Sequence, residues 1–181
     1  MGMLRLPIEG LKFFLRFNAM NIQHVALRYE VHENLLELNS KEIELLKKAA
    51  EAAENAYSPY SQFSVGAALL LDNDEVILGN NQENGAYPSG LCAERVAFFW
   101  KGANRKESIV RMVAIRAHSA VIATSHPITP CGACRQVMLE YELNQGEEII
   151  LLMQGSAGII YKMTGIKNML PLYFNEAGLK K

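Results

Sequence analysis

Apolar residues recur at helical spacing in residues 40–57, the first strongly patterned segment of the chain. Asn39, with Glu42 three residues later, has the pattern of a helix N-cap with a capping box. The apolar positions that follow are Ile43, Leu46, Ala50 and Ala53. This spacing predicts an amphipathic helix whose apolar side lies on a core.

Shorter apolar segments predict strands. The sequences FSVGAALLL (63–71) and EVILGN (75–80), separated by turn residues, predict a β-hairpin. Further strands are expected in VRMVAIRA, EEIILLMQ and GIIYKMT, and helices in CAERVAFFW and GACRQVMLEYE. The apolar run 96–100 is expected to anchor the first of these two helices in the core. Together the segments predict a three-layer α/β fold with a mixed sheet of about five strands covered by helices.

The length and composition suit one folded domain. Half of the 181 residues are apolar, and no Pro/Gly/Ser-rich linker divides the chain. We expect a single folded domain over residues 39–181. Residues 1–38 carry no recognisable chemical motif and are interpreted as an N-terminal extension of unknown role, in which Met20 offers an alternative start.

The charge balance restricts the partners. With 18 basic and 19 acidic residues the formal charge is -1, so nucleic acid is not an expected partner and a small neutral ligand fits better. Glu9, Lys12 and Arg16 interrupt the apolar N-terminal stretch, which argues against a signal peptide or a membrane span. Only three cysteines occur, in two short motifs, which favours a reducing compartment. We therefore expect a cytoplasmic protein.

These two motifs suggest a metal site. Cys131 and Cys134, in PCGAC, are three residues apart, so on the first turn of a helix both thiols lie on one side and can bind one metal ion. Cys92, from the start of the other helix, would be a third ligand. Three protein ligands leave the fourth tetrahedral position of Zn²⁺ open, as in catalytic sites. Glu94 could then take a proton from water at that position.

Three thiolates around one zinc ion would leave a net negative charge that is costly to bury. The N-termini of the two helices offset part of this charge, since each presents unpaired N–H groups. Arg95 and Arg135 directly follow the two motifs, and we expect them to donate hydrogen bonds to the sulfurs. The alternative, that each arginine lies on a solvated helix face, stays open.

Other interpretations of the cysteines also stay open. A Cys-x-x-Cys pair can be a redox site and a lone cysteine is often a small core residue, but neither explains Cys92 together with Glu94. A closed structural zinc site would need a fourth ligand, for which His118 or His126 is available between the motifs.

The combination of Cys-Ala-Glu with Pro-Cys-x-x-Cys resembles the zinc-dependent cytidine deaminases of the three-cysteine class. The similarity runs from about residue 45 to residue 174 and includes YSPYSQFSVGAALL, GNNQENGAYPSGLCAER, PCGACRQV and MLPLYF. It implies a cytidine deaminase-like fold, one Zn²⁺ per chain held by Cys92, Cys131 and Cys134, and Glu94 as the proton shuttle. It also implies a homotetramer and a role in pyrimidine salvage.

The resemblance assigns substrate contacts as well. Asn81 and Glu83 match positions that bind the ribose hydroxyls, Phe63 an aromatic residue of the nucleoside pocket, and Ala93 a further substrate contact. Phe174 resembles an aromatic residue that reaches into a neighbouring subunit's site. The expected reaction is hydrolytic deamination of cytidine and 2'-deoxycytidine with release of ammonia. Deamination of another aminopyrimidine such as blasticidin S, or a non-catalytic zinc-stabilised binding module, are the alternatives.

Overall fold

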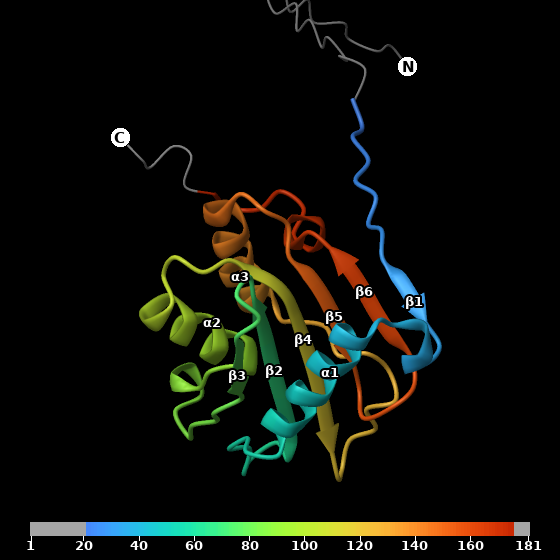
Figure 1. The fold of residues 1–181 in the computed structure, drawn as a ribbon. Helices are drawn as coiled ribbons and strands as arrows, with labels where there is room; N and C mark the ends of the chain where they lie inside the picture. Colours follow the sequence, from blue (N-terminus) through green and yellow to red (C-terminus); the bar gives the residue numbers. More distant parts are fainter. Residues whose placement is uncertain (1–20, 176–181) are drawn as a thin grey trace, which may run out of the picture.

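The computed structural model describes residues 21–175, so Met20 and the interrupted apolar stretch before it lie outside the described residues. This part of the chain forms three α-helices and a six-stranded sheet with the strand order β1-β6-β5-β4-β2-β3 (Figure 1). The strands are β1 (Glu30–His32), β2 (Phe63–Leu71), β3 (Val76–Asn80), β4 (Val110–Ser119), β5 (Ile150–Gln154) and β6 (Ile160–Thr164). The α-helices are α1 (Ser40–Ala53), α2 (Ala93–Asn104) and α3 (Gly132–Gln145), with short 3-10 helices η1 (Leu35–Glu37), η2 (Tyr87–Ser89) and η3 (Ile166–Met169).

The sheet is mixed, as the sequence predicts. β4 and β5 are parallel, and the other neighbouring strands are antiparallel, including the predicted β2–β3 hairpin. The sequence predicts about five strands, whereas the sheet has six. The additional strand is β1, which pairs with β6 at the edge of the sheet. A three-residue strand has too short an alternation to be recognised in the sequence, and this one lies within the segment interpreted as an extension.

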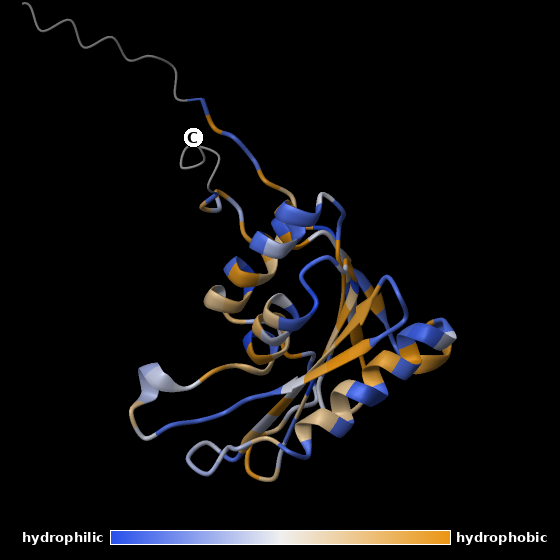
Figure 2. Cartoon of the chain, turned by 60° about the vertical axis from the view of Figure 1, so that its left-hand side comes forward, coloured by the Kyte–Doolittle hydropathy of each residue, from blue (hydrophilic) through white to orange (hydrophobic). Residues whose placement is uncertain are grey.

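Helix α1 covers one face of the sheet, and its N-cap is the one predicted. The Asn39 side chain accepts from Glu42 N and the Glu42 carboxylate accepts from Asn39 N, each at 3.0 Å. The predicted buried side was only half right. Leu46 and Ala53 are buried, whereas Ile43 and Ala50 are only partly buried, at the margin of the stripe. The side that faces the sheet consists of Leu45, Leu46, Ala49, Ala52 and Ala53 (Figure 2).

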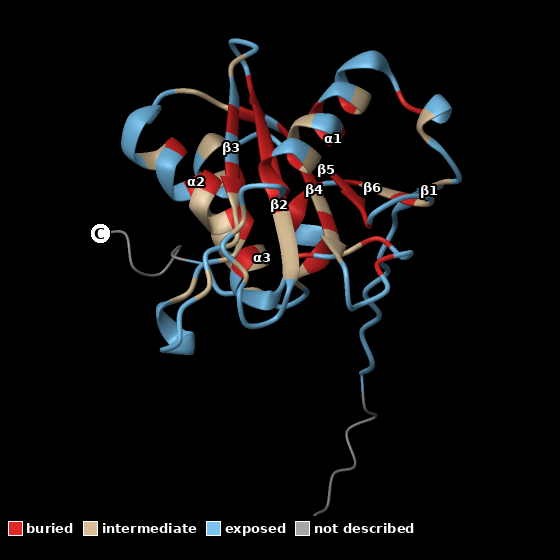
Figure 3. Ribbon diagram, turned by 90° about the horizontal axis from the view of Figure 1, so that it is seen from below, coloured by how far each residue is buried: buried red, intermediate tan, exposed pale blue. Residues whose placement is uncertain are grey.

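Helices α2 and α3 pack side by side on the other face and enclose the larger core with the sheet (Figure 3). Phe98 is fully buried there, but Phe99 and Trp100 are 46% and 44% exposed. The expectation that the whole run 96–100 anchors α2 was therefore wrong at its end, because successive helical residues point about 100° apart and cannot all face one core. No helix within residues 21–175 is long and apolar enough to cross a membrane.

Candidate metal centre and substrate cavity

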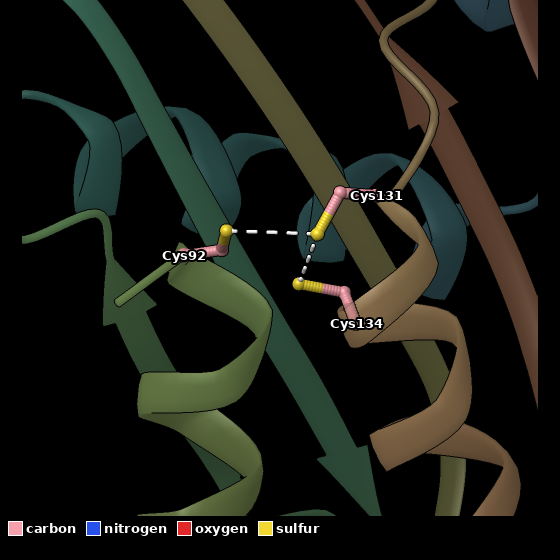
Figure 4. Close-up of side chains that lie close together, drawn as sticks. All are labelled: Cys92, Cys131 and Cys134. Atoms are coloured by element: carbon pink, nitrogen blue, oxygen red, sulfur yellow. Dashed lines mark hydrogen bonds between the residues drawn. The ribbon is translucent and has the colours of Figure 1, made fainter. Parts of the chain in front are cut away.

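The three cysteines meet where the N-termini of α2 and α3 lie next to each other (Figure 4). Cys92 is the N-cap of α2, Cys131 is the N-cap of α3, and Cys134 lies in the first turn of α3. The sulfur of Cys131 is 3.8 Å from that of Cys92 and 3.3 Å from that of Cys134. All three sulfurs lie within 4.8 Å of one another.

This triangle of sulfurs fits a zinc ion. Tetrahedral zinc with bonds of about 2.3 Å to sulfur requires sulfur–sulfur separations of roughly 3.8 Å. Among residues 21–175, the metal-binding group consists of these three cysteines alone. His118 lies 3.9 Å from a Glu54 oxygen, and His126 is exposed and outside the group. The described residues therefore offer three ligands and no closing fourth one.

The environment of the cluster favours the thiolate form of Cys92. Hydrogen bonds from Cys134 and from Arg95 lower the pKa of Cys92 to about 5. The Arg95 guanidinium donates to Cys92 Sγ over 3.6 Å, the contact expected from the sequence. The pKa of Cys134 is raised, first by its hydrogen bond to Cys92 and then by burial. A second thiolate in this cluster therefore needs a cation to compensate for its charge.

Arg135 does not make the sulfur contact expected from the sequence. Its Nε donates to Pro130 O over 2.9 Å, and its terminal nitrogens donate to Met169 O and to the Thr129 hydroxyl. Pro130 directly precedes Cys131, so the guanidinium holds the backbone that places this cysteine and joins it to η3. The position next to a ligand in sequence did not decide the direction of the side chain, because two carbonyl oxygens and a hydroxyl group act as acceptors for it instead.

Glu94 occupies the second position of α2 and is only 4% exposed. Burial raises the pKa of its carboxyl group, with the charge of Cys92 adding to the effect. Glu94, Cys92 and Cys131 all line one cavity, so the acidic residue and two of the cysteines border the same space. A carboxyl group that readily holds a proton next to a three-sulfur site is suited to proton transfer.

This cavity has a volume of about 700 Å³ and lies on the side of the sheet covered by α2. Phe63, Asn81 and Glu83 line it, as do Arg95 of α2, Tyr87 of η2 and Tyr60. Ala93 is fully buried between Cys92 and Glu94 and does not line it. Phe174 is 67% exposed and does not line its own chain's cavity.

Asn81 is held by the start of β2, and Glu83 by the segment just before it. The Asn81 amide donates to Phe63 O over 2.9 Å and accepts from Val65 N over 2.8 Å. The Glu83 carboxylate accepts from the Ser61 hydroxyl at 2.5 Å and from the backbone N–H of Tyr60 and Ser61. These bonds, with that of the Ser61 hydroxyl first, lower the pKa of Glu83.

Ser61 was not singled out from the sequence. Its hydroxyl donates to Glu83 and accepts from Phe63 N over 3.1 Å, so it links two residues that line the cavity. A serine two residues after a proline has the pattern of an ordinary turn. The one signal in the sequence was its place within YSPYSQF, which is part of the family resemblance.

Comparison with known proteins agrees with this geometry. The family model described as "Cytidine and deoxycytidylate deaminase zinc-binding region" matches residues 39–146, which include the three cysteines and Glu94. The chain belongs to this deaminase family. A cytidine deaminase of Halalkalibacterium halodurans is 47% identical over 96 residues, which are 53% of this chain and 68% of that protein. A cytidine deaminase of Mycobacterium tuberculosis is 37% identical over 103 residues, 57% of this chain and 71% of its own length.

Solved structures of the deaminase family share the fold. A cytidine deaminase from Burkholderia pseudomallei superimposes with a TM-score of 0.63 at 32% identity, over 76% of this chain and all (100%) of the other. One from Mycobacterium tuberculosis superimposes with a TM-score of 0.56 at 30% identity, over 73% of this chain and 95% of that chain. The predicted α/β fold is confirmed by these matches, and the zinc-binding character of the matched region agrees with the cysteine cluster.

Proposed function

We propose that the chain catalyses the zinc-dependent hydrolytic deamination of cytidine and 2'-deoxycytidine to uridine and 2'-deoxyuridine. The observation that carries the proposal is that the buried Glu94 lines the same cavity as Cys92 and Cys131 of the three-cysteine cluster. Membership of the deaminase family and the similarity to cytidine deaminases support the choice of substrate. The cavity volume of about 700 Å³ accommodates a nucleoside.

Cys92, Cys131 and Cys134 would hold the zinc ion. When bound, zinc supplies the Lewis acidity that makes water a nucleophile at neutral pH. Two features of the chain stabilise the negative charge of the cysteine ligands. Cys92 and Cys131 lie at the N-termini of α2 and α3, where the helix dipoles are positive, and Arg95 donates to Cys92 Sγ. Arg135 contributes indirectly, by holding the carbonyl that precedes Cys131.

Glu94 would move the protons. Because burial raises its pKa, this carboxyl group can accept a proton when water adds to C4 of the pyrimidine and then donate it to N3. A second transfer through the same group protonates the departing amine, which leaves as ammonia. Water is consumed and no oxidant or reductant is needed.

The remaining residues of the cavity would orient the nucleoside. Glu83, whose pKa is lowered, is a carboxylate that can accept hydrogen bonds from the ribose hydroxyls, with Asn81 beside it. Phe63 offers an apolar wall, and Ala93 offers the backbone between the cysteine and the glutamate. These roles follow from the family resemblance, and the lining of the cavity supports those of Phe63, Asn81 and Glu83.

We propose the rest of the setting on the same basis. Residues 39–181 form the catalytic domain, four chains assemble into a homotetramer, and Phe174 from one chain completes the cavity of a neighbour. The high exposure of Phe174 supports this assembly, since an aromatic ring gains by burial in an interface. The place of action is the cytoplasm, and the role is pyrimidine salvage.

The test is an assay of the purified full-length protein with cytidine, 2'-deoxycytidine and blasticidin S, with and without a chelator. We expect about one zinc per chain for a single three-thiolate site, turnover of the two nucleosides, and loss of turnover on chelation that added zinc restores. Cys131→Ala is expected to lose both metal and turnover. A zinc-loaded protein without turnover would favour the binding-module alternative, and preference for blasticidin S would overturn the choice of substrate.

A further inference from the structure

Arg116 lies on the opposite side of the sheet from the catalytic cavity. Along β4 the residues alternate between the two faces, and Ala114, two positions before Arg116, belongs to the core under α1. The guanidinium lines a second cavity, of about 440 Å³, which none of the catalytic residues contacts. The walls of this cavity are η1 with the two residues before it, and the connection from β5 to β6.

The guanidinium is fixed in a hydrogen-bonded frame. One terminal nitrogen donates to Gln154 Oε1 over 2.6 Å, and the other donates to Ser156 O over 2.8 Å. Gln154 is 3% exposed and donates in turn to Gly158 O over 2.8 Å. The two side chains also lie opposite each other in the β4–β5 register. The orientation of the guanidinium is therefore set before any ligand arrives.

Both acceptors of Arg116 are uncharged, so nothing in the described residues neutralises it. Its Nε is buried and has no hydrogen-bond partner there, and burial alone accounts for the shift of its pKa, which is downward. Glu33 is the one acidic residue on the cavity wall, but it is exposed and makes no ion pair with Arg116 within residues 21–175. A guanidinium does not lose its proton in proteins. A half-buried guanidinium without a counter-charge is therefore stabilised by a bound anion.

We propose that this second cavity, here called the Arg116 cavity, binds a small oxyanion, a phosphate or a carboxylate group. The planar fork of a guanidinium matches two oxygens of either group, and the donors are the remaining N–H groups of the two terminal nitrogens, since Nε is buried. Binding supplies the missing counter-charge without displacing the bonds to Gln154 and Ser156. The volume of this cavity, about 440 Å³ against about 700 Å³ for the catalytic one, favours a small ligand.

The Arg116 cavity is also connected to the loop that leads to Cys131. Ser156 N donates to Thr124 O over 2.9 Å, and a Cβ on Gly155 would lie 1.8 Å from the same oxygen. The two loops are thus in close backbone contact. The proposal concerns binding and does not depend on turnover, so it can fail while the proposed deaminase activity holds, and the reverse.

The test measures binding of inorganic phosphate and of acetate to the zinc-loaded protein, by calorimetry and by thermal unfolding, against chloride at equal ionic strength. We expect saturable binding with a dissociation constant below about 1 mM, at least tenfold weaker in Arg116→Gln and in Arg116→Lys. The matched control is Arg111→Gln, which removes the same charge from an exposed position of β4 paired with Glu147. It is expected to bind phosphate as the wild type does.

Glu33→Gln, which removes the acidic residue on the wall, is expected to tighten phosphate binding. The relative affinities for phosphate and acetate identify the natural class of ligand. Equal binding by Arg116→Gln and the wild type would overturn the proposal. So would no binding in the wild type, or binding only at concentrations where Arg111→Gln and Arg116→Gln behave alike, which would mark an adventitious ion only. Arg116→Lys keeps the charge and decides the matter if Arg116→Gln fails to fold.

Discussion

Glu94 shows how a single residue is adapted by its surroundings. Its position near the N-terminus of α2 would by itself favour the ionised form, but burial dominates and raises its pKa. Glu94→Gln keeps the volume of the side chain and removes the titrating group. We therefore expect the variant to keep its zinc and its fold while turnover of cytidine falls at least about 10²-fold.

Zinc content by atomic absorption and turnover by ultraviolet absorbance check this expectation. The control is Glu107→Gln, an exposed position beyond α2, which should keep full activity. Turnover by Glu94→Gln within a few-fold of the wild type would show that the proton moves by another route.

Ser61 provides the second prediction at this scale. Its hydroxyl fixes the Glu83 carboxylate at 2.5 Å and accepts from Phe63 N, so its loss should free two cavity residues together. Ser61→Ala is expected to raise KM for cytidine about three- to tenfold with little change in kcat, because ground-state and transition-state binding are weakened alike. Ser61→Thr should recover most of the loss, and Ser89→Ala, an exposed serine of η2, should change nothing. A fall in kcat with unchanged KM would contradict this positioning role.

The role of a residue could be predicted from the sequence where its partners lie nearby in the chain. The cysteine spacing on one helical turn needed no knowledge of the fold, and the described structure brings the three sulfurs together as expected. Arg95 follows Cys92 by three residues and Arg135 follows Cys131 by four, and only Arg95 donates to sulfur. Ser61 and Arg116 were missed because their partners, Glu83 and Gln154, are 22 and 38 residues away in sequence.

At the scale of elements, the contact between β3 and α2 places the start of the catalytic helix. A Cβ on Gly79 would lie 2.5 Å from Ala93 O and 2.7 Å from Ala97 N, so the helix backbone rests directly on this glycine. Gly79→Ala must push α2 outward and move Cys92 and Glu94 relative to α3. We expect weaker zinc retention during dialysis and at least about tenfold lower turnover, since small displacements of catalytic groups have large effects.

Gly132→Ala is the matched control for Gly79→Ala. It lies at the first position of α3, beside another cysteine, but a Cβ there meets nothing within 4 Å. It should keep zinc and activity, because alanine is a better helix residue than glycine. Equal losses in the two variants would mean that glycine itself, and not the close approach to α2, matters at these positions.

The pattern of apolar residues predicted the helices and longer strands well and their buried sides less well. Ala49 and Ala52 face the sheet while Ile43 lies at the margin, because small residues let α1 approach β2 closely. A Cβ on Gly66 would lie 1.9 Å from Ala49 O. Such a close approach is a property of two elements together, so hydrophobicity along one of them could not indicate it.

At the scale of the whole molecule, several aromatic residues are exposed on the surface, although aromatic side chains generally favour burial. Phe99, Trp100 and Phe174 are all more than two-fifths exposed in the single chain. Gln136 of α3 holds the backbone of Phe174 by a hydrogen bond to its carbonyl oxygen over 3.1 Å. The ring is thus presented outward by a fixed backbone, which is the arrangement expected of a residue that acts on a neighbouring chain.

This arrangement predicts complementation between two variants of low activity. Phe174→Ala should lower turnover at least about tenfold, through loss of a large apolar contact, and should keep its zinc. Glu94→Gln has low activity for a different reason. If Phe174 completes a neighbour's cavity, a mixed tetramer contains sites with Glu94 from one variant and Phe174 from the other, and these sites are intact.

Dissociating the two variants together and reassembling them should therefore raise the activity above the mean of the two, whereas each variant treated alone should keep its own low activity. Sedimentation of the reassembled protein gives the number of chains, and a pair of differently tagged subunits reports mixing. Mixed tetramers without recovered activity would mean that Phe174 serves its own chain, since every site with an intact Glu94 would then still carry the alanine.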